Sequence, residues 1–357
     1  MKKLKCAIIG AGNISGKHLH GYKSQSDRVE LAAVCDIIPE RAEAKAKEFG
    51  IPDVYTDYGM IAKRKDIDFV CICLPNYLHC PATVQFLNAG KHVHCEKPMA
   101  LNGKQANEML AVSRATGKKL MVGVNNRFTN QAAFVKGYIN DGKLGKVYYS
   151  RCGWIRRGGL SYAGWFCDKK LAGGGPMIDL GVHFIDLTLY YLGYPEFDSI
   201  SARTFAKFGT DDNVRQLYTF DGAKADFNQK YTVEDFIAGF VNFKDDSCMS
   251  FEVSWASNIE KEKTFYEILG DKGGLRYDSG AAAPLKIYSV EQGQFVDIEP
   301  KIKSDAYGIS EFGHFADCIL ADKEPTIAPP EQTAKMMELI DAAYKSAEKN
   351  GRQVVFK

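Results

Sequence analysis

Apolar residues in the first 125 positions form short uninterrupted runs, and stretches with helical composition lie between them. The stretch 39–49, for example, starts with a proline, is rich in Ala, Glu and Lys, and stops at Gly50, which is typical of a helix. Strands that alternate with such helices predict βαβ units and a parallel sheet, whose strands are apolar throughout because both faces are covered. The predicted strands are residues 4–9, 29–35, 54–55, 67–74, 91–95 and 120–124, and the predicted helices are 39–49, 78–88 and 103–116.

The pattern changes in the second half of the chain, from about residue 146 to residue 296. Many short segments there are rich in Val, Ile, Tyr, Phe and Thr, and turn residues separate them. This pattern predicts a large, mostly antiparallel sheet, interrupted by one helix over 177–192. We therefore expect an α/β protein with a first domain over 1–124 and a second over 125–357. A late helix over 330–349 is expected to pack back on the first domain.

Length and charge narrow the range of functions. The chain has 357 residues, with 46 Lys and Arg against 44 Asp and Glu, so its formal net charge is +2. This balance offers no basic footprint for nucleic acid and no cationic face for a membrane. No stretch approaches the ~18 apolar residues of a membrane-spanning helix, and the first residues lack the apolar core of a signal peptide. We expect a cytoplasmic protein that binds neither nucleic acid nor membrane.

The ten cysteines agree with that expectation. They include no Cys-x-x-Cys pair, and several lie inside apolar runs, where free cysteine behaves as a small buried hydrophobic residue. The stretch 92–95 (His-Val-His-Cys) holds potential metal ligands, but on a strand residues 92 and 94 face one side and residue 95 the other. No metal site is expected.

A glycine-rich turn follows the first predicted strand and leads into a helix. Gly10 permits the tight turn, Gly12 lets backbone N–H groups approach a pyrophosphate, and Ser15 stands where a third glycine is usual. The helix N-terminus adds partial positive charge. Asp36 ends the second predicted strand, where a carboxylate binds ribose hydroxyls and repels a 2′-phosphate, so NAD is expected rather than NADP. The predicted cofactor-binding residues of this region are Gly10, Gly12, Asn13, Ile14 and Asp36.

Two further stretches complete the pattern. Residues 96–98 (Glu-Lys-Pro) follow the fifth predicted strand, and residues 173–186 carry three glycines, a proline, and then Asp179 and His183. Together with the N-terminal turn, these stretches resemble the Gfo/Idh/MocA oxidoreductases, a family that includes inositol dehydrogenase and glucose–fructose oxidoreductase. The resemblance covers essentially the whole chain. It implies a doubly wound Rossmann domain joined to an α/β domain whose large open sheet commonly makes the oligomer contact, so we expect a homodimer or homotetramer.

The residues of these motifs also make chemical sense by themselves. Asp179 and His183 are four positions apart, so one face of a single helix carries both. Lys97 follows the carboxyl end of a parallel strand, where open α/β sheets bind their ligands. By resemblance to the family, His183 is the general base on a substrate hydroxyl and Lys97 stabilises the developing oxyanion. Asp179 orients the substrate or the histidine.

The resemblance assigns further residues around this centre. Residues 75–79 match the family's loop near the nicotinamide, and residues 125–128 match the stretch where its first domain continues into the second. His79 either caps a helix or lines the cofactor pocket. Arg127 either lies at the rim of the substrate pocket or joins the domains through an ion pair. The implied cofactor set is completed by Pro75, Asn76, His79, Glu96 and Lys97.

The segment before the glycines is expected to contribute to the substrate pocket. Trp154 and Trp165 offer faces that stack on sugar rings, although such aromatic residues fit a sheet core equally well. A secondary ring hydroxyl of a sugar, glycoside or cyclitol is the expected substrate, with hydride passing to the nicotinamide. The adjacent Arg156 and Arg157 alternatively receive a phosphate, as in a nucleotide sugar or sugar phosphate. The predicted substrate-binding residues are Arg127, Arg156, Trp165, Asp179 and His183.

Two other functions stay open from the sequence. A glycoside hydrolase or lyase that recycles NAD, or an oxidoreductase that holds NAD tightly, needs the same Lys97 and His183. Net release of NADH distinguishes a dehydrogenase from both. A non-catalytic sensor of sugar or NAD is disfavoured, because such proteins tend to lose the lysine or the histidine.

Overall fold

The computed structural model describes residues 3–162, 164–220, 225–303 and 310–356. The chain divides into two units, Met1–Phe128 with Gly308–Met337, and Thr129–Tyr307 with Glu338–Lys357. The first unit is therefore assembled from two distant parts of the chain. None of the helices in the described ranges combines the length and apolar composition that crossing a bilayer requires.

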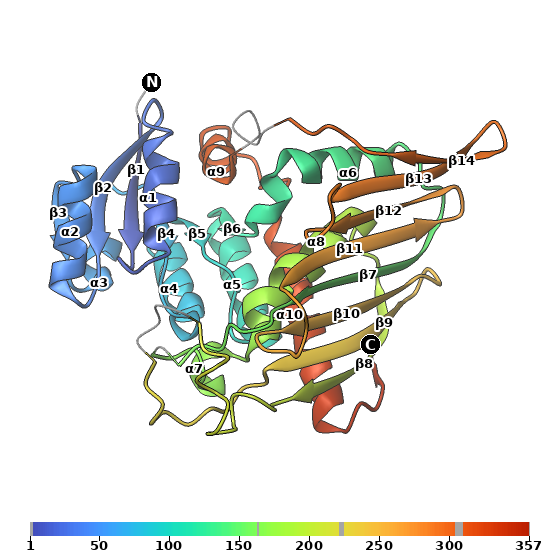
Figure 1. The fold of residues 1–357 in the computed structure, drawn as a ribbon. Helices are drawn as coiled ribbons and strands as arrows, with labels where there is room; N and C mark the ends of the chain where they lie inside the picture. The colour runs from blue at the N-terminus through green and yellow to red at the C-terminus, as the bar shows by residue number, and fades with distance from the viewer. Residues whose placement is uncertain (1–2, 163, 221–224, 304–309, 357) are drawn as a thin grey trace. The chain divides into compact units, whose positions relative to one another are not determined.

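The first unit contains a six-stranded parallel sheet (Figure 1). The strand order is β3-β2-β1-β4-β5-β6. Successive strands are added on one side of β1 up to β3 and on its other side from β4 onward, so the strand order reverses between β1 and β4. In such doubly wound sheets ligands bind beyond the carboxyl ends of the strands at that reversal. The strands are β1 (Leu4–Ile9), β2 (Val29–Cys35), β3 (Asp53–Tyr55), β4 (Phe69–Ile72), β5 (His92–Cys95) and β6 (Leu120–Val122). The helices are α1 (Ser15–Lys23), α2 (Pro39–Phe49), α3 (Tyr58–Ala62), α4 (Asn76–Asn88) and α5 (Gly103–Thr116), followed by a 3-10 turn over Asn125–Phe128.

Two late segments complete this unit. α9 (Glu311–Leu320) buries Phe312 and Phe315 in the same apolar cluster as Tyr22 and Phe69. The first part of α10 (Pro330–Glu348) also belongs here, and its Thr333 contacts the sulfur of Met99. The core of the dinucleotide-type sheet is thus finished by residues from the far end of the chain.

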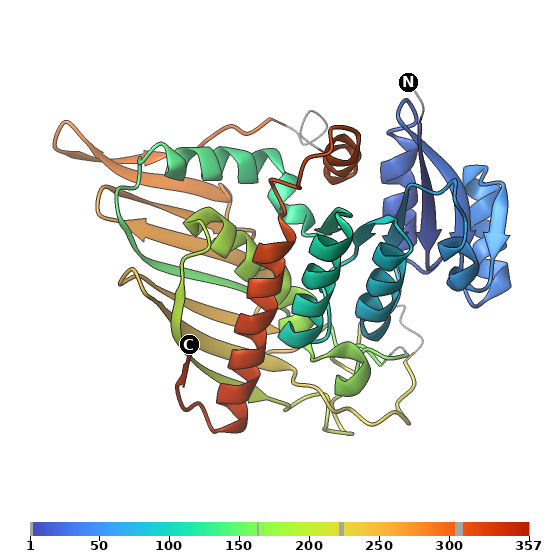
Figure 2. The ribbon, with the colours of Figure 1, turned by 180° about the vertical axis from the view of Figure 1, so that it is seen from behind.

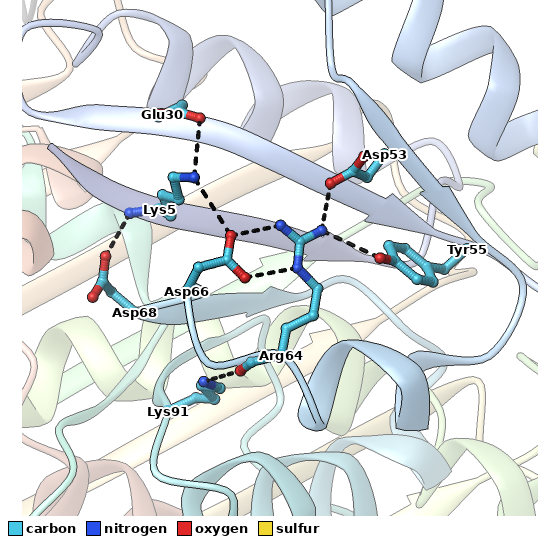
Figure 3. A network of polar contacts seen from close by, with 8 residues as sticks. All are labelled: Lys5, Glu30, Asp53, Tyr55, Arg64, Asp66, Asp68 and Lys91. Carbon is cyan, nitrogen blue, oxygen red and sulfur yellow. Dashed lines mark hydrogen bonds and ion pairs between the residues drawn. The ribbon is translucent and has the colours of Figure 1, made fainter.

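The amino end of the same sheet carries a network of charged side chains (Figure 3). Arg64 donates to Asp53 at 2.5 Å and to Asp66 at 2.7 and 3.0 Å. Lys5 lies 3.4 Å from Asp66 as well. The Lys91 ammonium donates to the Arg64 carbonyl oxygen at 2.5 Å. These contacts join the beginnings of β1, β3 and β5 to the turn after α3.

The second unit is built on a nine-stranded sheet in the order β14-β13-β12-β11-β7-β10-β9-β8-β15. All neighbouring strands are antiparallel except β7 and β10. α6, α8 and the later part of α10 lie on one face of this sheet (Figures 1 and 2). The strands are β7 (Val147–Ile155), β8 (Phe197–Phe205), β9 (Phe236–Phe243), β10 (Cys248–Ser254), β11 (Lys263–Gly270), β12 (Gly273–Asp278), β13 (Leu285–Glu291), β14 (Gln294–Ile298) and β15 (Val354–Val355). The helices are α6 (Asn130–Asn140), α7 (Lys169–Ala172) and α8 (Val182–Leu192).

In the central strands, alternate side chains point toward the face of the sheet that the helices cover, and these side chains are buried. On β10, Met249, Phe251 and Val253 are buried, as one covered face requires. On the other face, Tyr148 and Phe240 are exposed. The predicted fold class, a doubly wound parallel sheet followed by a large and mostly antiparallel open sheet, is confirmed.

Candidate active site

The glycine turn lies at the carboxyl end of β1. Gly10 has a φ of +98°, and a Cβ there would lie 2.5 Å from the carbonyl oxygen of Cys73, so only glycine fits. Its N–H donates to the Cys35 carbonyl oxygen at 2.7 Å. Gly12 differs, because a Cβ there would meet no atom within 4 Å. The fold therefore requires Gly10, whereas Gly12 borders open space through which a phosphate can approach the backbone.

Asp36 is bonded to this turn. Its Oδ2 accepts the N–H of Ala11 at 2.7 Å, and its Oδ1 accepts the N–H of Ile38 at 2.9 Å. Each carboxylate oxygen keeps further acceptor capacity, which ribose hydroxyls need. Asn13 and Ile14 are exposed on the turn, and Ile14 precedes the first residue of α1. The five residues predicted for this part of the cofactor site thus lie on one turn and the strand end beside it.

Glu96 and Lys97 lie at the carboxyl end of β5. Glu96 is 5% exposed, and its Oε1 accepts a hydrogen bond from Nε2 of His18 at 2.6 Å. Its Oε2 accepts the backbone N–H of Lys97 at 2.9 Å. Burial raises the pKa of Glu96, but the hydrogen bond and charge of His18 outweigh burial and hold this pKa well below its usual range. Glu96 is an ionised anchor for the backbone of Lys97, whose side chain is half-buried.

His79 holds two loops by their backbones. Its Nδ1 lies 2.7 Å from the Pro98 carbonyl oxygen, and its Nε2 lies 2.8 Å from the Leu74 carbonyl oxygen. Burial lowers the pKa of this histidine, although both contacts act in the opposite direction. Pro75 precedes the first residue of α4, and that residue, Asn76, is buried. His79 therefore joins the loop after β4 to the segment after β5.

Arg127 is buried within the first unit, with 2% of its surface exposed. Its guanidinium donates to the Ile327 carbonyl oxygen at 2.9 Å and to Oε1 of Gln332 at 2.5 Å. These bonds join the 3-10 turn after β6 to the late segment of the same unit. The part expected for Arg127 in substrate binding stays a prediction.

The glycine-rich segment of the second unit packs against two polar side chains. A Cβ on Gly174 would collide with the hydroxyl of Tyr344, and one on Gly175 would collide with the carbonyl oxygen of Glu234. The buried Glu234 carboxyl accepts the N–H of Gly175 at 3.1 Å, the N–H of Met177 at 3.2 Å and the Tyr344 hydroxyl at 2.9 Å. Burial raises the pKa of Glu234 despite these bonds. Glu234 thereby fixes the start of the helix that follows.

That helix is not a regular α-helix throughout. Its first turn, Met177–Gly181, is π-helical, and α8 continues from there. The helix predicted over 177–192 is thus present with the predicted bounds, and the shared face of Asp179 and His183 stays a prediction. Asp179 lies on the π turn and His183 on α8. π-helical turns are rare in proteins, and those that occur are often found at functional sites.

Two tryptophans adjoin these residues. The indole N–H of Trp255 donates to Oδ2 of Asp179 at 3.0 Å. The ring of Trp154 lies beside His183, with ring centroids 5.8 Å apart. Asp179 and His183 are both half-buried, so each remains accessible while an aromatic residue restrains it.

Arg156 joins the same neighbourhood through a shared carboxylate. Oε1 of Glu262 accepts the Trp154 indole N–H at 2.6 Å and Nε of Arg156 at 3.2 Å. The Arg156 guanidinium lies 4.9 Å from the centroid of the Trp154 ring. Trp165 lies in the loop before α7, where it stacks on Phe166.

Sequence reasoning missed the residues that support this centre. Glu234, Trp255, Glu262 and His18 lie far along the chain from the groups they bind. Glu234 lies two residues before β9, and its local sequence does not distinguish it from a surface carboxylate. A side chain that bonds to a turn far away in the sequence produces no local pattern from which this contact could be predicted.

Comparison with known proteins agrees with this geometry. Residues 4–124 match the Gfo/Idh/MocA oxidoreductase family model with an NAD-binding Rossmann fold, and residues 136–355 match the model of that family's C-terminal α/β domain. The chain is 33% identical over 351 residues to D-glucoside 3-dehydrogenase of Escherichia coli strain K12, which covers 98% of this chain and 97% of that protein.

Solved structures share the whole fold. A levoglucosan dehydrogenase in complex with NADH and L-sorbose has a TM-score of 0.85 over the full length of both chains, and at 21% identity it shows the fold alone. The aldose-aldose oxidoreductase from Caulobacter crescentus, complexed with glycerol, has a TM-score of 0.79 at 26% identity, and covers 99% of this chain and 100% of its own.

These matches confirm three of the predictions made from the sequence, namely a Rossmann domain, NAD as cofactor and an oxidoreductase. The glycine turn and Asp36 fit that cofactor, because they combine close backbone access with acceptors for ribose hydroxyls. The chain belongs to the Gfo/Idh/MocA family of NAD-binding oxidoreductases.

Proposed function

We propose that this protein oxidises a secondary ring hydroxyl of a glycoside, most specifically a D-glucoside, with NAD as the hydride acceptor. The observation that carries the proposal is the group around the glycine-braced helix, where His183 lies beside Trp154 and Asp179 is bonded to Trp255. An indole face next to a titratable imidazole suits a sugar ring whose hydroxyl must lose a proton. The relative at 33% identity is named for a D-glucoside substrate.

Each polar residue has one part in this reaction. His183 takes the hydroxyl proton, because imidazole titrates near working pH. Lys97 donates a hydrogen bond to the same oxygen as negative charge develops on it. Asp179 orients the substrate or His183. Bound NAD supplies the hydride acceptor, so the alcohol leaves as a ketone.

A neutral substrate is favoured over a phosphorylated one. Arg156 is paired with Glu262, and Arg157 donates to the Glu260 carbonyl oxygen at 3.0 Å. A carboxylate beside a guanidinium reduces its attraction for a second anion. The phosphate alternative for this arginine pair is therefore the weaker one.

A substrate panel tests the proposal. Purified protein is mixed with NAD and with methyl D-glucosides, free hexoses, inositols or hexose phosphates, and NADH absorbance is followed. We expect NADH with the glucosides and little with the phosphates. A keto-sugar or cleaved product without net NADH would instead show that NAD is recycled. No product with any member of the panel would overturn the proposal.

His183 provides the internal test. His183→Ala should lower turnover at least ~100-fold, because a positioned general base contributes 10²–10⁴-fold. His20→Ala is the matched control, since His20 is exposed on α1. Turnover of His183→Ala close to that of this control would remove His183 from the reaction.

A further inference from the structure

The core of the first unit holds a polar cluster that the proposed reaction does not use. His18 on α1, Cys71 on β4 and His94 on β5 each place one potential ligand atom within 4.8 Å of the other two. All three side chains are fully buried. The sulfur of Cys73 lies 3.9 Å from that of Cys71. These four residues, 18, 71, 73 and 94, are called the His–Cys cluster below.

Each histidine of the His–Cys cluster is held at one ring nitrogen by an outer polar group. Nε2 of His18 bonds to Glu96 at 2.6 Å, and Nδ1 of His94 lies 2.7 Å from the hydroxyl of Tyr22. The other nitrogen of His18 lies 3.0 Å from the Cys71 sulfur. Histidines that bind metals nearly always have such an outer partner on the second nitrogen, which fixes the ring and its tautomer.

The remaining nitrogen of His94 is an orphan. Its Nε2 is buried and has no hydrogen-bond partner within the described part of the chain. Buried polar atoms are nearly always paired, so such an atom calls for a specific explanation. Rings of Phe312 and Phe315 pack against His94, so its surroundings are otherwise apolar.

The spacing of the sulfurs is suited to one tetrahedral ion. Two sulfurs bound to the same zinc lie about 3.8 Å apart, given Zn–S bonds of about 2.3 Å. The Cys71 and Cys73 sulfurs already have this separation. The contact between His18 and Cys71 must widen by about half an ångström to admit an ion between them.

We propose that the His–Cys cluster is a buried structural site for Zn²⁺, with His18, Cys71 and His94 as the three ligands whose atoms already lie within 4.8 Å of one another. The Cys73 sulfur, which adjoins that of Cys71, would move inward to complete the tetrahedron. Imidazole and thiolate are the ligands that zinc prefers in closed structural sites. As the ion binds, the thiol protons of both cysteines and the Nδ1 proton of His18 leave to solvent, whereas Nε2–H of His18 keeps its bond to Glu96. Because the site is enclosed, the ion is taken up as the unit folds, and it ties α1 to β4 and β5.

The sequence pattern of β5 alone does not predict this cluster. The stretch 92–95 contains two histidines, but Nδ1 of His92 accepts the N–H of Lys119 at 2.9 Å instead. Only His94 joins the cluster, and its partners come from two other elements. The alternation of side chains along β5 is as expected, but the proposed site combines one residue of this strand with residues of α1 and β4, which the alternation cannot predict.

Metal analysis of the full-length protein tests the proposal without any activity assay. Protein purified without chelator should contain about one zinc per chain by inductively coupled plasma mass spectrometry. After unfolding with chelator and refolding with Co²⁺, the protein should show thiolate-to-cobalt charge-transfer absorption in the near ultraviolet. Zinc-free protein that folds with the same melting temperature in the presence and absence of added Zn²⁺ would overturn the proposal.

Two variants locate the ion. His94→Leu should lose the zinc and the cobalt absorption, because it removes a ligand and fills the same space with apolar atoms. Cys95→Ala is the matched control, because Cys95 is the next residue of β5, is also buried and faces the opposite side of the strand. It should keep the metal. Full zinc content in His94→Leu would show that the ion is bound elsewhere and would end the proposal.

Discussion

Charged residues gather at both ends of the six-stranded sheet, and the two ends use them differently. At the amino end, Arg64, Asp66 and Lys5 bind one another through side chains that are partly open to solvent. At the carboxyl end, Asp36 and Glu96 bind mainly backbone N–H groups of the turns that follow the strands.

This difference teaches how to recognise the functional end. Exposed ion pairs add little stability, because solvent screens them and their side chains lose freedom. A carboxylate bonded to a turn instead holds the geometry of the backbone that a cofactor approaches. The larger network is therefore at the end of the sheet where we expect no chemistry, so the size of a polar network does not identify a site.

The comparison is tested most severely by one lysine from each end. Lys97→Ala should lower turnover at least ~100-fold with a small change in melting temperature, because in the proposed reaction its amine stabilises the oxyanion. Lys91→Ala, at the amino end, should lower the melting temperature and leave turnover nearly unchanged, because its ammonium bonds the Arg64 carbonyl oxygen at the opposite end of the sheet from the glycine turn. NADH formation and thermal unfolding measure both effects. Equal losses of turnover would erase the distinction between the two ends.

The two glycines of the turn separate folding from binding. Gly10→Ala should destabilise the protein by at least about 2 kcal/mol, because its φ and the Cys73 carbonyl oxygen forbid a side chain. Gly12→Ala should keep the melting temperature but weaken NAD binding about tenfold or more, because the new methyl group points into space that a phosphate approaches. Calorimetric titration with NAD, together with thermal unfolding, decides. Retained NAD affinity in Gly12→Ala would contradict the assigned position of the cofactor.

Asp36 tests cofactor choice at the same end. Asp36→Ser should shift the preference for NAD over NADP by about tenfold, because it removes the charge that repels a 2′-phosphate. The measurement is the ratio of kcat/KM for the two cofactors. A wild-type protein that already prefers NADP would contradict the interpretation of Asp36.

The smallest effect is expected at the amino end. The hydrogen bond from Arg64 holds the pKa of Asp66 well below its usual range, although burial acts in the opposite direction. A carboxyl whose pKa is lower in the folded state stabilises the protein fully above its unfolded pKa of about 4, and this contribution is lost progressively as pH falls from that value through the lower pKa of the folded state. Asp66→Asn should therefore lower stability at pH 7 by less than about 1 kcal/mol, since the side chain is 45% exposed. Urea unfolding should show a smaller difference in stability between the two proteins at pH 3 than at pH 7. A larger difference in unfolding free energy at pH 3 than at pH 7 would contradict the predicted effect of Asp66.

Much of the first sheet was predictable, because glycine and proline mark its element ends. β1 (Leu4–Ile9), α2 (Pro39–Phe49) and α5 (Gly103–Thr116) have the predicted bounds. The strand predicted over 67–74 is longer than β4 (Phe69–Ile72). Its last apolar residues belong to the turn that packs on Gly10, where the Cys73 carbonyl oxygen lies. An apolar run records burial, and burial continues past the last strand hydrogen bonds.

The supporting contacts of the site were not predictable in the same way. The glycine turn, Asp36, Lys97 and His183 stand in recognisable local patterns. The brace from Glu234 and the π turn under Asp179 depend on which distant segments meet. The spacing of apolar residues predicts that a segment is helical, but it does not distinguish an α-helical turn from a π-helical one. The π-helical first turn could therefore not be predicted.

α9 has a consequence for the order of events during synthesis. The core around Tyr22 and Phe69 is closed by Phe312 and Phe315, which are translated about 180 residues after Phe128. At typical elongation rates the ribosome needs roughly ten to forty seconds for that interval. The nascent dinucleotide-binding half therefore waits, with part of its apolar surface uncovered, until nearly the entire polypeptide has emerged. A gene fragment that stops at Phe128 therefore encodes only part of this core.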